Sequence, residues 1–230
     1  MAVPVRVLSS MATRGLLEEL TQVHAEHRGV PVAFEAVGGV EAARRVSAGE
    51  SFDIVVLAAD AIDRLAQAGH LDASSTRDIV RSEVGVAVRA DAPRPDIGSE
   101  DALRRAVLAA DRIGYSTGPS GTALMALFAR WGIAGEVESR LVQAPPGVPV
   151  ASLVARGDVT LGFQQMSELL GMPHIAIVGQ MPAPVRITTV FSAALCTGAP
   201  AREAALALLD FLDSPQTDEA KRRHGMSPAR

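Results

Sequence analysis

The chain has 230 residues, of which 48% are hydrophobic and only 3% aromatic, so it can form one large domain or two of about 100 residues with cores of aliphatic side chains. Its formal net charge is −4, from 22 Lys plus Arg and 26 Asp plus Glu, and the basic residues are spread among the acidic ones. This distribution disfavours a nucleic-acid partner. No apolar run approaches the roughly 20 residues that a membrane-spanning helix needs.

The first ninety residues alternate between expected strands and helices. Strand-like runs occur at 5–8, 32–37 and 52–58, and the segments between them carry apolar residues at helical spacing, as in Leu16, Leu17 and Leu20. The third run is continuously apolar after Asp53, from residue 54 to residue 58, which is typical of the middle of a parallel sheet. This order predicts an α/β fold.

A second lobe is predicted to begin near "DAPRPDIGSED", where a segment with two prolines and several charged residues follows the strand-like sequence. Beyond this segment, helices are expected after Ser99, through Trp131 and at 150–155, and a strand at 159–163. The segment "RITTVFSAALC" is long enough to lead back to the first lobe. We therefore expect lobe 1 to comprise 1–85 plus 190–230 and lobe 2 to comprise 86–189, with two hinge strands and a ligand cleft between the lobes.

Small polar residues gather at three strand-to-helix junctions. They are Ser9 and Ser10, Gly38 and Gly39, and the stretch Ser116 to Thr122. At such junctions the first backbone N–H groups of a helix lack partners and the helix dipole is positive, which favours an anion. Each junction alone is also explained as a helix cap. The third holds more hydroxyls than one helix can use, so Ser120 or Thr122 is expected to cap the helix while the remaining hydroxyls, such as Ser116, and the glycines Gly118 and Gly121 face the ligand.

Two adjacent carboxamides, Gln164 and Gln165, follow the expected strand at 159–163. They can bind a ligand or merely solvate the turn. The charged residues expected near these edges are Glu41, Glu168 and Arg14, which are the candidates for a catalytic role if the protein is an enzyme.

Several other kinds of site are disfavoured. The chain has neither the Gly-Lys-Ser/Thr end of a phosphate loop nor the spaced glycines of a dinucleotide fold, and "GPSGT" does not match a Gly-x-Ser-x-Gly elbow. His24 and His27 are three residues apart on one helix, where a solvated helix end explains them better than a metal pair. Cys196 has apolar neighbours and is expected to be a buried hydrophobe. No metal and no cofactor are expected.

The order of several motifs resembles a known family. "VRVLSSMATRGLLEEL", "IGYSTGPSGTALMALFARWGI", "GDVTLGFQQMSELL" and "AALALLDFLDSPQTDEAKRRHGM" together resemble the type II periplasmic substrate-binding proteins, in the molybdate-binding branch of ABC importers. The resemblance implies a two-lobed Venus-flytrap fold that binds an anion without a counter-cation. Gln164 stands where molybdate binders carry a tyrosine, and Gly38-Gly39 stand where they carry a serine. With these departures, the sequence resembles a side branch of the family that also includes aconitate isomerase.

Two functions are therefore expected. The first is binding of a small anion, an oxyanion or a di- or tricarboxylate, as the solute-binding component of an ABC importer with a permease as partner. The alternative is an isomerase of an unsaturated carboxylate such as aconitate. A third, a ligand-sensing domain, stays open. The N-terminus shows no export signal, so the expected location is the cytoplasm if Met1 is the native start and the periplasm if a signal peptide has been removed.

Overall fold

The computed structural model describes residues 3–230. Two compact units form, one from Met1–Ser82 with Val190–Arg230 and the other from Glu83–Thr189; they are called unit 1 and unit 2 below. The chain passes from unit 1 to unit 2 within strand β4 (Arg77–Arg89) and returns within strand β9 (Thr188–Leu195). Within the described residues, no helix has both the length and the apolar character needed to cross a membrane.

Unit 1 begins with alternating strands and helices and is completed by the C-terminal part of the chain. Its strands, besides parts of β4 and β9, are β1 (Val5–Ser10), β2 (Val32–Val37), β3 (Ile54–Ala58) and β10 (Met226–Pro228). Its α-helices are α1 (Arg14–Arg28), α2 (Gly39–Ser47), α3 (Ala59–Gln67), α9 (Arg202–Asp213) and α10 (Asp218–Arg223). Short 3-10 helices lie at Met11–Thr13, Ala73–Ser75 and Pro215–Thr217.

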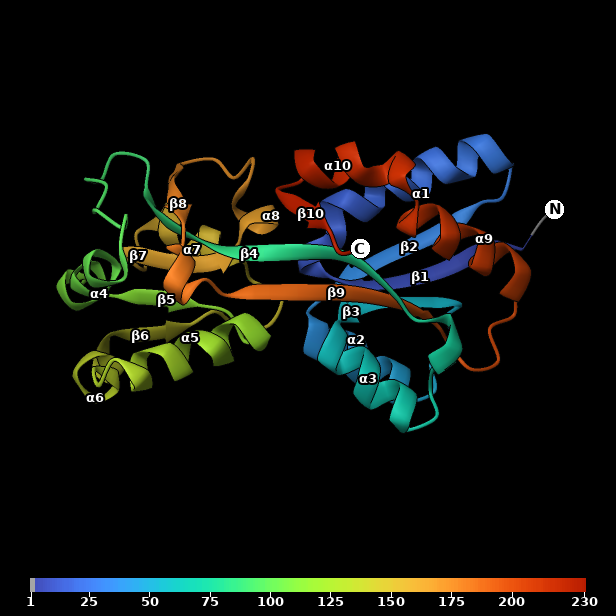
Figure 1. Cartoon of the computed structure of the whole chain (residues 1–230), viewed down its shortest axis with the longest axis horizontal. Coiled ribbons are helices and arrows are strands. Elements are labelled where there is room, and N and C mark those ends of the chain that lie inside the picture. Colours follow the sequence, from blue (N-terminus) through green and yellow to red (C-terminus); the bar gives the residue numbers. More distant parts are fainter. Residues whose placement is uncertain (1–2) are drawn as a thin grey trace. The chain divides into compact units, whose positions relative to one another are not determined.

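The sheet of unit 1 is built around β1, which lies between β2 and β3 and is parallel to both. Strand β9 pairs antiparallel with β3, and β10 pairs antiparallel with β4. Helices α1, α9 and α10 lie on one side of the sheet, and α2 and α3 lie on the other (Figure 1). All five residues of β3 are buried, as its apolar run predicts. The carboxyl ends of β1, β2 and β3 therefore share one edge of this sheet.

Unit 2 has a second sheet with its own helices. Its strands, besides parts of β4 and β9, are β5 (Ile113–Tyr115), β6 (Leu141–Gln143), β7 (Leu161–Gln165) and β8 (Ile175–Gln180). Its α-helices are α4 (Glu100–Ala109), α5 (Pro119–Arg130), α6 (Ala134–Val137), α7 (Val150–Arg156) and α8 (Met166–Leu169). Short 3-10 helices lie at Glu138–Arg140 and Ala183–Val185.

The sheet of unit 2 places three parallel strands side by side, with β5 between β6 and β7. Strand β4 is antiparallel to both β7 and β8. Two glycines on neighbouring strands allow α7 to lie close to the sheet, because a Cβ on Gly114 or Gly162 would come within 2.9 or 3.1 Å of Val150. On α5, Leu124, Leu127 and Phe128 are buried and form the face that packs into the core of unit 2.

Strand ends and helix starts differ from the sequence-based predictions. Ser9 and Ser10 are the last two residues of β1, and Gln164 and Gln165 are the last two of β7, instead of following these strands. The reason is pairing: Ser10 is in register with Val37 of β2. The predicted cap of α5 is also wrong, because Gly118 holds the N-cap position and Pro119 begins the helix, in keeping with the preference of proline for the first helical position.

The expectation of a solvated His24 is wrong as well. The imidazole of His24 is buried, with its ring centroid 5.2 Å from that of Phe211 in α9, and burial lowers its pKa. By contrast, Ser99 caps α4 as predicted, since its side chain accepts a hydrogen bond from the backbone N–H of Ala102.

Candidate functional site

At the carboxyl edge of unit 1, the structure brings together the polar residues of two junctions. Ser10 ends β1, and its Cβ lies 3.6 Å from the position that a Cβ on Gly39 would occupy. Ser9 donates a hydrogen bond from its hydroxyl to the carbonyl of Ser10 over 3.0 Å. The hydroxyl oxygen of Ser10 is buried and makes no hydrogen bond to any described group. This edge therefore contains a buried hydroxyl that no described protein group satisfies.

Helix α2 adds backbone donors to this edge. Its first intrahelical hydrogen bond runs from the N–H of Ala42 to the carbonyl of Gly38, so the N–H groups of Gly39, Val40 and Glu41 precede the hydrogen-bonding pattern of the helix. These donors and the positive end of the helix dipole favour a negative group. Since Ser10 lies beside Gly39, one small anion can accept from the serine hydroxyl and from the backbone at once.

At the carboxyl edge of unit 2, the small polar residues between β5 and α5 form a tight turn. The hydroxyls of Ser116 and Ser120 lie 3.0 Å apart and share a hydrogen bond. Gly121 is buried, and a Cβ on it would lie 1.9 Å from the carbonyl oxygen of Ser116, so its role here is to let the turn close. Thr122 is exposed on the first turn of α5. The turn thus keeps Ser116 and Ser120 together.

Gln164 links this edge to a carboxylate. Its side-chain oxygen accepts a hydrogen bond from the backbone N–H of Ala151, at the start of α7, over 2.9 Å. Its Nε2 therefore points the other way and donates to Oε1 of Glu168, also over 2.9 Å. Burial raises the pKa of Glu168 to about 7, and the hydrogen bond from Gln164 opposes that rise. Glu168 is thus a carboxyl group that can exchange a proton near neutral pH.

The neighbouring amide, Gln165, points in a different direction. Its Nε2 donates to the hydroxyl of Thr189 in β9 over 2.8 Å, and its Oε1 is buried without a hydrogen bond to any described group. The alternation of side chains along a strand explains why the two glutamines separate. Gln165 therefore links β7 to β9 through its Nε2, while its Oε1 has no partner among the described groups.

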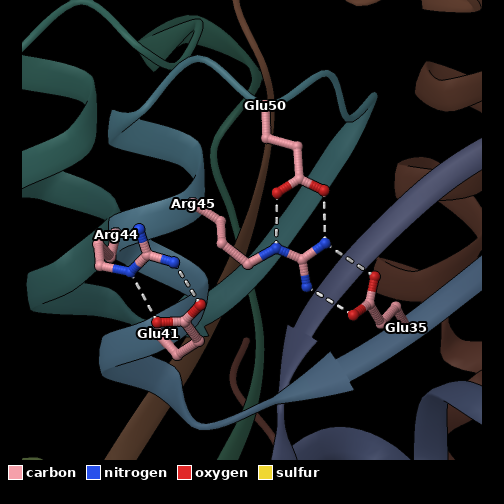
Figure 2. A network of polar contacts seen from close by, with 5 residues as sticks. All are labelled: Glu35, Glu41, Arg44, Arg45 and Glu50. Atoms are coloured by element: carbon pink, nitrogen blue, oxygen red, sulfur yellow. Dashed lines mark hydrogen bonds and ion pairs between the residues drawn. The ribbon is translucent and has the colours of Figure 1, made fainter.

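The other two charged candidates, Glu41 and Arg14, are engaged in ion pairs on the surface. Figure 2 shows Glu41 bound through both oxygens to Arg44, beside the pairs that Arg45 makes with Glu35 and Glu50. The hydrogen bond from Arg44 lowers the pKa of Glu41. Arg14 donates to Glu18 over 2.7 Å, with both side chains about half exposed. Of the three charged candidates, Glu168 alone contacts a glutamine of the sheet edge among the contacts described.

Two hydrogen-bond partners in this site, Ala151 and Thr189, were not predicted from the sequence. Ala151 contributes only its backbone N–H, and Thr189 lies in a strand that returns from a distant part of the chain. The only indication of Ala151 in the sequence was the helix expected to start after "APPGVP", because the first backbone N–H groups of that helix are free to donate. No comparable signal marks Thr189.

Metal-binding side chains do not gather in the described part of the chain, where no three of His, Cys, Asp and Glu are placed to hold an ion. Cys196 is buried, as expected, and burial raises the pKa of its thiol to about 12. Such a thiol stays protonated and is a poor nucleophile.

Known proteins resemble this chain over almost its whole length. An aconitate isomerase from Pseudomonas sp. is 34% identical over 230 residues, covering 96% of this chain and 87% of that protein. The periplasmic molybdate-binding protein of Azotobacter vinelandii superposes with a TM-score of 0.83 at 17% identity, covering 98% of this chain and 100% of that one. The sulfate-binding protein of Mycobacterium tuberculosis superposes with a TM-score of 0.80 at 17% identity, covering 99% of this chain and 87% of that one.

These likenesses confirm the predicted α/β fold of the periplasmic binding proteins. The model of one protein family, described as bacterial extracellular solute-binding protein, matches residues 5–227. The chain belongs to the family of bacterial extracellular solute-binding proteins.

Proposed function

We propose that this protein binds a small anion, an oxyanion or a di- or tricarboxylate, through hydroxyl and backbone N–H groups at the carboxyl edges of its parallel strands. The observation that carries the proposal is the buried hydroxyl of Ser10, which has no partner among the described groups and lies beside the start of α2. Leaving a buried polar group unpaired costs about 1–3 kcal/mol. An anion bound at this edge would accept its hydrogen bond and remove that cost.

The proposed ligand groups lie at the carboxyl edges of the parallel strands within each unit. They are Ser9, Ser10, Gly38, Gly39, Ser116, Ser120, Gly121, Thr122, Gln164 and Gln165. The glycines contribute backbone N–H groups, the hydroxyls and amides contribute side-chain donors, and no counter-cation is required.

The proposed biological role is that of the solute-binding component of an ABC-type importer, which works in the periplasm and delivers its ligand to a permease. Membership of the solute-binding family supports this role. So do the structural likenesses to proteins named for binding molybdate and sulfate.

A ligand panel tests the proposal. Thermal shift and calorimetry are run with molybdate, tungstate, sulfate, phosphate and a series of di- and tricarboxylates. We expect at least one anion to raise the melting temperature and to bind with a 1:1 stoichiometry. Absence of binding by every anion, in both measurements, contradicts the proposal.

Isomerisation of an unsaturated carboxylate such as aconitate is the second candidate function. It is favoured by the identity of 34% with an aconitate isomerase and by Glu168, a carboxyl group whose pKa of about 7 suits proton transfer at neutral pH. Following cis-aconitate by proton NMR in the presence of the protein tests it. Appearance of the trans isomer supports catalysis, and an unchanged spectrum at high protein concentration refutes it.

A further inference from the structure

We infer that Glu168 is the catalytic acid–base residue of this protein and that Gln164 is the residue that positions it, in an allylic proton shift on an unsaturated carboxylate. The inference rests on the second candidate function and names the groups that would perform it. Four observations carry it: the bonds of Gln164, the face on which it lies, the surroundings of Glu168 and the chemistry of the shift.

The hydrogen bonds of Gln164 fix the carboxylate of Glu168 in one orientation. Because the backbone N–H of Ala151 can only donate, it holds the side-chain oxygen of Gln164, and the amide nitrogen must face Glu168. The amide is buried, so it has little freedom to turn. Oε1 of Glu168 receives the bond from Gln164, and Oε2 takes no part in it. The second oxygen is the one available in this arrangement to take a proton from a ligand.

Gln164 lies on the face of the sheet that α7 covers. In neighbouring strands, Gly114 is in register with Gly162, and a Cβ on either would approach Val150 of α7. Side chains alternate along a strand, so Gln164, two residues beyond Gly162 in β7, points to that same face, in keeping with its hydrogen bond to Ala151 of α7. On this face, Gln164 joins the first turn of α7 to the carboxylate of Glu168.

The surroundings of Glu168 are largely uncharged. Helix α8 packs against β7, and Met166 and Leu169 of this helix lie against Gly85 of β4. The charged side chains that β4 and α7 contribute in unit 2 are each in an ion pair of their own, Glu83 with Arg186, Arg89 with Asp91 and Arg156 with Asp158. Burial is the larger cause of the raised pKa of Glu168, which is about 7. A carboxylate desolvated in this way is a stronger base than an exposed one.

The reaction needs only one such group. The carboxylate of Glu168 takes a proton from the methylene carbon that lies between a carboxylate and the double bond. The C–H electron pair passes into a conjugated dienolate, whose charge the hydroxyl and N–H donors stabilise. The protonated carboxyl then returns the proton to the former alkene carbon, so that the double bond moves by one carbon. No electron acceptor, donor or additional reactant is consumed.

The substitution Glu168→Gln tests the assignment with cis-aconitate as the probe. We expect the rate of isomerisation to fall by about 10²-fold or more, since this is the size of general acid–base effects, while the calorimetric affinity for the same ligand changes by less than about 3-fold. The matched control is Glu138→Gln, at an exposed glutamate of the same unit, which should keep the wild-type rate.

The role of Gln164 is tested by the pH profile of the rate. Removing its hydrogen bond, which lowers the pKa of Glu168, should move the acid limb of the profile of Gln164→Leu to higher pH. A purely structural role would lower activity without moving that limb. If Gln164→Leu does not fold, Gln164→Asn, which shortens the amide, should move the limb in the same direction.

The outcomes separate this inference from the proposed anion binding. If the wild-type protein binds anions but does not isomerise cis-aconitate, the inference is overturned and the binding function stands. If it isomerises and Glu168→Gln retains the rate, the base lies elsewhere and the inference is again overturned. If no anion binds at all, both fail.

Discussion

The carbonyl oxygen of Ser116 occupies the space that a side chain at Gly121 would need. A Cβ on Gly121 would lie 1.9 Å from this oxygen and 3.0 Å from its carbon, far inside van der Waals contact. This close approach closes the turn between β5 and α5 and keeps the hydroxyls of Ser116 and Ser120 within 3.0 Å of each other. Gly121 thus shapes the proposed anion site through the backbone.

Gly121→Ala is therefore expected to destabilise unit 2 and to weaken ligand binding together. The methyl group must displace the backbone, which costs about 1–3 kcal/mol or more of unfolding free energy. Urea denaturation and calorimetry measure the two effects. Gly118→Ala is the matched control, because a Cβ there would meet nothing within 4 Å. Equal stability of the two variants would contradict this account of the turn.

Ser10→Ala is expected to weaken ligand binding without lowering the stability of the ligand-free protein. The hydroxyl it removes makes no hydrogen bond to a described group, so the ligand-free protein should keep or gain stability. The hydrogen bond to a bound anion, worth about 1.5–3 kcal/mol, is lost, and the affinity should fall by about 10-fold to 100-fold. Ser120→Ala should weaken the same ligand, whereas Ser139→Ala, at an exposed serine, should not. A Ser10→Ala variant with full affinity would remove Ser10 from the site.

Glu168 is expected to make stability depend on pH. Its pKa rises from an ordinary 4.5 to about 7 in the folded protein, so between these values the native state binds more protons than the unfolded state. Unfolding free energy should then fall as pH rises from 4.5 to 7, by about 1–3 kcal/mol in total. Urea denaturation across this range should show the fall in the wild-type protein and lose it in Glu168→Gln. Glu138→Gln should retain the wild-type profile, and an identical profile for Glu168→Gln would contradict the raised pKa.

Lys221 is the only lysine of the chain, and its Nζ is buried without a hydrogen bond to a described group. Burial is the main cause that lowers its pKa from 10.5, and Arg230 adds to the effect. Lys221→Met should therefore raise the unfolding free energy at pH 7 by about 1–3 kcal/mol, because it removes an unpaired buried group.

The same lysine predicts a second pH dependence. Between its lowered pKa and 10.5 the unfolded state binds more protons than the native state, so wild-type stability should rise with pH in this window. Lys221→Met should lack the rise. The control Arg222→Met, at an exposed neighbour, should retain it and stay within about 0.5 kcal/mol of the wild-type protein at pH 7. A loss of stability in Lys221→Met at pH 7 would show that the amine has a partner.

Local patterns predicted the elements of this fold better than their ends. The apolar run of β3 and the buried face of α5 follow from side-chain periodicity, which a sequence displays directly. The ends of β1 and β7 were placed too early, because Ser10 and Gln165 have polar side chains that suggested a turn. Their backbone groups pair with neighbouring strands all the same, and such pairing depends on residues elsewhere in the chain.

The environment of a residue was predicted well only where its partners are close in sequence. Ser99 caps its own helix, and this was predicted. His24 was expected in solvent, but Phe211 of α9 covers it. No residue near His24 in the sequence indicates that a helix much later in the chain will cover its side chain.

By itself, the sequence determined the α/β order of strands and helices and the clustering of hydroxyls, glycines and amides where strands meet helices, because both depend on local periodicity and composition. Only the tertiary structure decided how these polar groups are used. It pairs Gln164 with Glu168 and Ala151, leaves the hydroxyl of Ser10 without a partner beside Gly39, and binds Glu41 to Arg44. Hydrogen bonds and desolvation depend on which segments pack together, and that packing is set by the whole chain.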